Sequence, residues 1–286
     1  HAFDHAMSLI YYDGVTVAPK GTAANRGQTL SILSEEHYRL TTGEDTIALL
    51  EYLDAQKESL TDVEARIVEI ALRDIREMKQ IPMEEYVAYQ QVLVEADDAW
   101  HTAKETNDFA LFLPYLEQIF ATERRFAAYC APDMHPYNYC LDKYEEGLTM
   151  EKCDEFFGTL RSRLVPLIAK IGAAQQVSDA CILGDFPEHE QEKFSLTLMQ
   201  TMGIDMAHCG LGTTEHPFTT HFNTKDVRMT THYYEENLLS SMYSVIHEGG
   251  HALYELGADD CYNYTNLSGG VSMGIHESQS RFYENI

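Results

Sequence analysis

Residues 247–251 have the sequence His-Glu-Gly-Gly-His, which places two imidazoles and a carboxylate within five positions. In a helix, His247 and His251 lie one turn apart on the same face, so both can bind the same metal ion. Zinc bound to neutral nitrogens keeps a position for water and lowers the pKa of that water to about 7. Glu248 can accept a proton from this water during attack on a peptide carbonyl. The pattern therefore favours a zinc peptidase, although a chain with 13 histidines can contain it by chance.

Good helix formers continue from Ala252 to Leu256, and Gly257 is expected to end this helix. Two adjacent glycines, Gly249 and Gly250, interrupt it at a cost of about 1 kcal/mol each relative to alanine. That cost indicates a role for glycine at both positions. Close approach of a substrate and close packing of another backbone are equally consistent with it.

A third ligand is expected on a second helix, after a loop at positions 263–270 that is rich in asparagine, serine and glycine. Glu277 is the favoured residue, because two histidines and one glutamate are the protein ligands in one class of catalytic zinc sites. Its neighbour His276 is a competing ligand. His276 can equally orient substrate or be an ordinary polar residue of the helix.

Helical periodicity dominates the rest of the chain. Thr61 and Glu64 have the spacing of a capping box ahead of an apolar stripe, and Pro82 fits the first turn of the next helix. Further helices are expected near residues 109–129, 149–172 and 188–202. Strand-forming residues gather between Thr213 and Tyr234, which predicts a small antiparallel sheet beside the His-Glu-x-x-His helix. The expected fold is mainly α, with long helices forming a groove that contains the active site.

Four motifs, in this order, make the chain similar to a known family. They are His216-Pro217-Phe218, the Asp-x-Arg-x-Thr pattern of residues 226–230, the pentapeptide at 247–251, and His-Glu-Ser-Gln at 276–279. The chain resembles the carboxypeptidase Taq family of zinc carboxypeptidases, and residues 141–149 also resemble a segment of that family. The resemblance covers nearly the whole chain.

The resemblance implies a metallocarboxypeptidase that removes C-terminal amino acids from peptides. It implies zinc, with cobalt as an alternative, held by His247, His251 and Glu277, and water activated by Glu248. It also implies a homodimer. His216 either helps to bind substrate and stabilise developing charge, or is a histidine of a structural turn. Residues 226 and 228 are expected to form an ion pair that braces the site from behind.

Family members continue beyond the third ligand with a segment that completes the groove and recognises the terminal carboxylate of the substrate. We therefore expect residues 1–286 to form a single metallopeptidase catalytic domain that lacks this C-terminal portion. Such a chain should bind metal but cleave peptides poorly, because its substrate is not aligned. A zinc endopeptidase or oligopeptidase, and an inactive metal-binding fragment or scaffold, are the alternative functions.

The composition excludes several partners. A formal net charge of -26, from 20 Lys and Arg against 46 Asp and Glu, would repel nucleic acid and anionic membrane surfaces. No apolar run approaches the roughly 20 residues that span a bilayer, and no signal segment is recognisable. Six dispersed cysteines without CxxC spacing are expected to be reduced core residues. A cytoplasmic location is therefore favoured.

Overall fold

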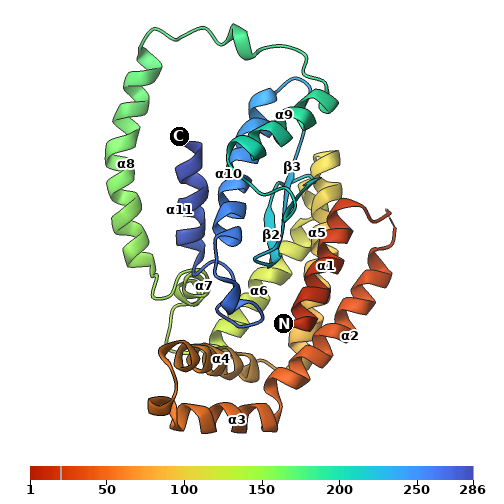
Figure 1. The fold of residues 1–286 in the computed structure, drawn as a ribbon, viewed down its shortest axis with the longest axis vertical. Coiled ribbons are helices and arrows are strands. Elements are labelled where there is room, and N and C mark those ends of the chain that lie inside the picture. The colour runs from red at the N-terminus through yellow and green to blue at the C-terminus, as the bar shows by residue number, and fades with distance from the viewer. Residues whose placement is uncertain (20, 286) are drawn as a thin grey trace. The chain divides into compact units, whose positions relative to one another are not determined.

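The computed structural model describes residues 1–19 and 21–285, and this part of the chain is mainly helical (Figure 1). It forms two compact units. The first comprises His1–Pro136 with Asp259–Ser268, and the second comprises Tyr137–Ala258 with Gly269–Ile286. All candidate site residues belong to the second unit. The single catalytic domain expected over residues 1–286 stays a prediction, and so does the groove.

The first unit is helical throughout its described residues. Its helices are α1 (Ala2–Thr16), α2 (Ala23–Thr42), α3 (Glu44–Ala55), α4 (Asp62–Gln80), α5 (Met83–Thr106) and α6 (Leu113–Cys130), with short 3-10 turns at Lys57–Ser59, Phe109–Leu111 and Asp260–Tyr262. The sequence does not predict α1 to α3. Ser34 is the only buried residue among the described residues of these three helices, so their sequences have no clear apolar stripe.

The predicted start of α4 is confirmed. The Thr61 hydroxyl accepts from the backbone N–H of Glu64, and the Glu64 carboxylate accepts from the backbone N–H of Thr61 at 2.9 Å. The predicted helix after Pro82 is present as α5, with Pro82 at its N-cap and not within its first turn. Tyr89 packs edge-to-face on Phe126 and joins α5 to α6 in a small apolar core.

The second unit contains a sheet and the helices that flank it. Its elements are α7 (Pro136–Tyr144), whose first residue belongs to the first unit, α8 (Met150–Ala173), α9 (Glu188–Thr201), β1 (Cys209–Thr213), β2 (Thr219–Asn223), β3 (Asp226–Thr231), α10 (Leu238–Leu256) and α11 (Met273–Glu284), with a 3-10 turn at Ala180–Ile182. The expected helix end at Gly257 and the expected second helix that carries Glu277 are both observed.

The small sheet is mixed, which corrects the expectation of a purely antiparallel one. Its strand order is β1-β3-β2; β2 and β3 pair antiparallel as expected, but β1 runs parallel to β3. The reason lies in the connection between β1 and β2, which passes over the end of β3 instead of forming a hairpin. The Thr230 hydroxyl of β3 holds this connection by accepting from the Phe218 backbone N–H and by a hydrogen bond with the Thr214 hydroxyl.

The core of the second unit lies between the sheet and α10. Val227 and Met229 of β3, Val245 of α10 and Met199 of α9 are completely buried together. Burial on this scale contributes roughly 1.5–3 kcal/mol per side chain and fixes α10 against β3. The helix that carries the pentapeptide is therefore positioned by the sheet on one side.

Helix α11 packs along another side of α10, and the two helices lie side by side (Figure 1). A Cβ added at Gly250 would lie 2.7 Å from the Ser280 Cα atom of α11. A Cβ added at Gly249 would instead meet the Met202 side chain at 2.7 Å. Of the two roles that the sequence leaves open for these glycines, the structure provides direct evidence for close packing, and at Gly250 the partner is backbone.

The described residues contain no helix that combines the length and apolar character needed to cross a bilayer. The cysteines whose side chains are described are free, as expected: Cys130, Cys140, Cys153, Cys209 and Cys261. Only Cys209 of these is buried, so the expectation of core positions is wrong for the exposed Cys261. The side chain of Cys181 lies outside the described part.

We expect Gly250→Ala to lower the free energy of unfolding by at least about 1 kcal/mol, because the new methyl group meets backbone that no side-chain rotation can move. Gly249→Ala is the matched control, since Met202 can rotate away and alanine gains helix propensity. Urea unfolding of both variants measures the difference. Equal stabilities would contradict a backbone contact between α10 and α11 at this position.

Candidate active site

Three possible ligands converge where α10 meets α11. The Nε2 atoms of His247 and His251 lie 3.6 and 3.4 Å from the same oxygen, Oε2 of Glu277. One ligand atom from each residue lies within 4.8 Å of the other two. The structure thus brings together the three residues that the sequence proposes as a ligand set, and such a group can hold a metal ion.

A carboxylate on α11 orients His247. Nδ1 of His247 lies 2.5 Å from Oε1 of Glu284, which also accepts from Arg281. A carboxylate oxygen accepts, so Nδ1 carries a proton. Nε2 faces Glu277, and it is the nitrogen that has the lone pair when the ring binds a metal ion. Metal-binding histidines commonly have this kind of partner behind the ring.

His251 is more deeply buried than His247 and has a histidine behind it. Its Nδ1 lies 2.5 Å from Nδ1 of His276. Burial, together with the nearby His276 and His247, lowers the pKa of His251 to about 4. The ring is therefore neutral near pH 7, the state in which an imidazole binds metal.

Glu277 divides its two oxygens between two tasks. Oε1 accepts from Arg281 Nε at 2.7 Å, while Oε2 faces both histidines and lies 3.2 Å from the Ser280 hydroxyl. Burial raises the pKa of Glu277, but the Arg281 hydrogen bond and the neighbouring His247 outweigh it, and the net pKa is lowered. The carboxylate is therefore held in its charged, metal-binding form.

Glu248 is buried beside this group, with only 6% of its surface exposed. Its Oε2 accepts from the Thr219 hydroxyl of β2 at 2.7 Å, and its backbone oxygen lies 3.0 Å from the same hydroxyl. Burial raises the pKa of Glu248, while the Thr219 hydrogen bond opposes the rise. A carboxylate whose pKa is raised can take up and release a proton more readily near neutral pH.

His276 does not belong to the ligand group. Its Nδ1 faces His251, and its Nε2 lies 2.6 Å from Oε1 of Glu255. His276 therefore lies behind His251 and not among the three converging ligand atoms. The predicted ion pair of β3 is present: Arg228 donates two hydrogen bonds of 3.0 Å to Asp226.

His216 lies exposed on the connection between β1 and β2. Its backbone oxygen accepts from the Thr214 hydroxyl at 2.8 Å, which holds the turn in place. Three residues further on, Thr219 contacts Glu248. The turn is thus tied to the site through its backbone, and a substrate contact of the His216 side chain stays a proposal.

Sequence reasoning misses three residues that contact or support the group: Thr219, Glu255 and Glu284. Two of them have a helical signal, since Glu255 lies four residues after His251 and Glu284 lies seven after Glu277. These spacings place Glu255 on the same face of its helix as His251, and Glu284 on the same face of its helix as Glu277. Thr219 has no such signal, because it reaches Glu248 from a strand far away in the sequence.

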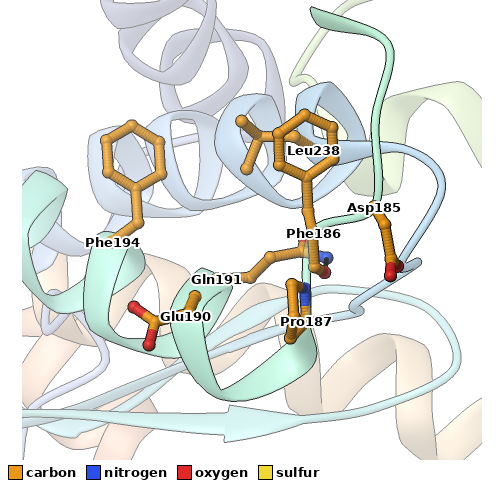
Figure 2. A pocket seen from close by; sticks show the side chains of 7 residues that line it. All are labelled: Asp185, Phe186, Pro187, Glu190, Gln191, Phe194 and Leu238. Carbon is orange, nitrogen blue, oxygen red and sulfur yellow. Dashed lines mark hydrogen bonds between the residues drawn. The ribbon is translucent and has the colours of Figure 1, made fainter.

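A surface depression of about 350 Å³ lies at the start of α9 and α10, and none of the candidate site residues lines it (Figure 2). Phe186, Pro187, Phe194 and Leu238 form its apolar part. The buried Gln191 amide donates to backbone oxygens on both sides and accepts from Ser241 of α10 at 2.6 Å. These hydrogen bonds tie α9 to α10, so Gln191 has a structural role.

Two imidazoles and a carboxylate, with a second carboxyl group buried beside them, are a donor set that fits a divalent metal ion. The chain belongs to the carboxypeptidase Taq (M32) metallopeptidase family, which matches over residues 1–286. The resemblance stated from the four motifs is thereby confirmed.

Individual relatives agree with this assignment. Carboxypeptidase 1 of Bacillus subtilis is 37% identical over 99% of this chain and 57% of its own length. Thermostable carboxypeptidase 1 of Pyrococcus furiosus is 35% identical over 100% of this chain and 58% of its own length. The chain therefore spans somewhat more than half the length of these relatives.

Solved structures show the same fold. The crystal structure of BsuCP matches with a TM-score of 0.96 at 37% identity, covering 99% of this chain and 57% of that one. The M32 carboxypeptidase from Deinococcus radiodurans R1 matches with a TM-score of 0.86 at 32% identity, with the same coverage. The expected fold, mainly helical with a small sheet beside the pentapeptide helix, is confirmed.

We expect Thr219→Val to lower the free energy of unfolding by about 1–3 kcal/mol, because it removes the hydroxyl donor from a buried carboxylate. Thr220→Val is the matched control, since the neighbouring side chain points to the opposite face of β2. Thermal or urea unfolding distinguishes the two. A loss at Thr220 as large as that at Thr219 would assign the effect to the strand and not to Glu248.

Proposed function

We propose that this chain is the metal-binding catalytic part of a zinc-dependent metallocarboxypeptidase that removes C-terminal amino acids from peptides. The observation that supports it most is the convergence of His247 Nε2, His251 Nε2 and Glu277 Oε2 beside the buried Glu248. Membership of a metallopeptidase family supports the reaction class. Relatives named carboxypeptidase support the end of the peptide that is cleaved.

The donor set favours zinc among the common metal ions. Two imidazole nitrogens and one carboxylate oxygen are typical ligands of catalytic zinc, whereas magnesium and calcium prefer oxygen ligands only. Cobalt is the alternative. When bound, the metal ion lowers the pKa of a water molecule and polarises the scissile carbonyl. His247, His251 and Glu277 would hold it, with Arg281 and Glu284 keeping the ligands aligned.

Glu248 is proposed to move the proton. Its carboxylate accepts a proton from the attacking water and later delivers that proton to the amine that leaves. The raised pKa of Glu248, which burial causes, suits both steps. The Thr219 hydroxyl fixes the orientation of the carboxylate through a 2.7 Å hydrogen bond. We assign His216, on the exposed turn before β2, to substrate binding.

Two alternatives share the same residues. A zinc endopeptidase or oligopeptidase would use the same ligands and the same base on internal peptide bonds. An inactive fragment or scaffold would retain the metal alone. Peptide substrates follow from the family; a cytoplasmic location and a homodimer stay predictions from the sequence. The need for a free terminal carboxylate separates the first alternative from the proposed function.

We expect Glu248→Gln to retain zinc but to lower turnover by about 100- to 10,000-fold, because an amide cannot accept the proton. His247→Ala combined with His251→Ala should lose zinc as well. Glu192→Gln, an exposed residue of α9, is the control for loss of a carboxylate. Zinc content and peptide hydrolysis are measured on each purified protein. Near-normal turnover of Glu248→Gln would remove Glu248 from the mechanism.

We expect the whole protein that contains this chain to shorten a free-acid peptide one residue at a time and to leave the C-terminally amidated peptide nearly intact. The reason is that recognition of the terminal carboxylate aligns the last peptide bond with the site. Mass spectrometry of the products over time shows the ladder. Equal cleavage of both peptides would favour the endopeptidase, and zinc binding without cleavage of either would favour the scaffold.

A further inference from the structure

We infer that Glu255 is a positioning residue for the proposed metal ligand His251, acting through His276. The inference rests on the proposed function, because it assigns a task to residues behind one of the ligands. It goes beyond the motifs, since neither Glu255 nor a role behind the ligand follows from the family resemblance. It depends on four adjoining contacts and on the chemistry of their atoms.

The contacts form a continuous path through the second unit. His251 Nδ1 faces His276 Nδ1 at 2.5 Å, and His276 Nε2 lies 2.6 Å from Glu255 Oε1. The same Oε1 lies 3.3 Å from His221 Nδ1 and accepts from the backbone N–H of Gly270 at 3.3 Å. The path therefore joins α10, α11, β2 and the loop before α11.

The chemistry of Glu255 sets the direction of every proton along this path. A carboxylate oxygen can only accept, so His276 carries its proton on Nε2. In a neutral imidazole the other nitrogen, Nδ1, then has the lone pair. His251 must donate to it from Nδ1, which leaves the lone pair of His251 on Nε2. That atom is the one that faces Glu277.

The surroundings keep Glu255 charged and in place. Burial raises the pKa of Glu255, but the hydrogen bonds from His221 and His276 outweigh it and lower the pKa to about 2. Only 5% of the Glu255 surface is exposed. A Cβ at Gly270 would overlap the His276 ring, and one at Gly269 would lie 2.6 Å from the His221 ring. The two glycines thus allow the loop to close over both histidines.

A buried carboxylate could instead serve stability alone, by neutralising two nearby histidines. The arrangement of the contacts separates the two roles. A stabilising ion pair requires only proximity, whereas a positioning role requires that one particular nitrogen of each ring carries the proton. The proton position is measurable directly, and so is the affinity for zinc in the absence of any substrate.

The first experiment compares zinc affinity, by competition with a chromophoric chelator, in the purified protein and in its Glu255→Gln and Glu192→Gln variants. Loss of the charge behind His276 should weaken zinc binding by about 10- to 100-fold, as expected for a partner behind a metal ligand. Glu192→Gln, on the exposed face of α9, should bind zinc as the parent does. Parent-like affinity in Glu255→Gln, or an equal loss in both variants, would overturn the inference.

The second experiment needs no variant and therefore does not depend on the folding of Glu255→Gln. Long-range proton–nitrogen NMR correlations of the zinc-loaded protein report which nitrogen of each histidine carries a proton. We expect the proton of His276 on Nε2 and that of His251 on Nδ1. The opposite assignment for either ring would overturn the inference. Failure of the proposed function gives a separate result. In that case the parent protein would bind zinc no more tightly than the variant that lacks the His247 and His251 imidazoles.

Discussion

The direct contact between the backbones of α10 and α11 is the constraint on which the candidate site depends. Gly250 lies inside the pentapeptide, and its missing side chain lets the Ser280 backbone approach α10. Glu277 lies three residues before Ser280 and Glu284 lies four after it, so both carboxylates reach the same side of the contact. Glu277 then faces Nε2 of both His247 and His251, and Glu284 contacts Nδ1 on the other side of the His247 ring. A methyl group at position 250 would push α11 away from α10 and change the distances from these carboxylates to the histidines.

The glutamates around this contact have three different electrostatic roles. Glu277 is half exposed, paired with Arg281 and kept charged, as a metal ligand requires. Glu248 is buried against Thr219, and its raised pKa suits a group that accepts and returns a proton. Glu284 lies behind His247, whereas Glu255 contacts His276, which in turn lies behind His251. The position of each carboxylate, and not the acidity of the chain as a whole, decides its task.

The sequence alone predicts the parts of the site that follow helical spacing. The pentapeptide helix, its end at Gly257, the second helix with Glu277 and the capping box at Thr61 all depend on local patterns, and all are present. The parallel pairing of β1 is not local, because the connection that crosses β3 depends on contacts of Thr230. The packing role of Gly250 likewise becomes evident only when α11 is placed beside it.

Zinc K-edge X-ray absorption on the metal-loaded protein tests the central claim most directly, because it identifies the atoms around the ion without a substrate. The account predicts a first shell of nitrogen and oxygen at about 2.0–2.2 Å with the multiple scattering of two imidazoles. In the variant that lacks the His247 and His251 imidazoles, this imidazole signature should disappear. A shell that contains sulfur at about 2.3 Å, or one without imidazole in the parent protein, would contradict the ligand set and with it the proposed mechanism.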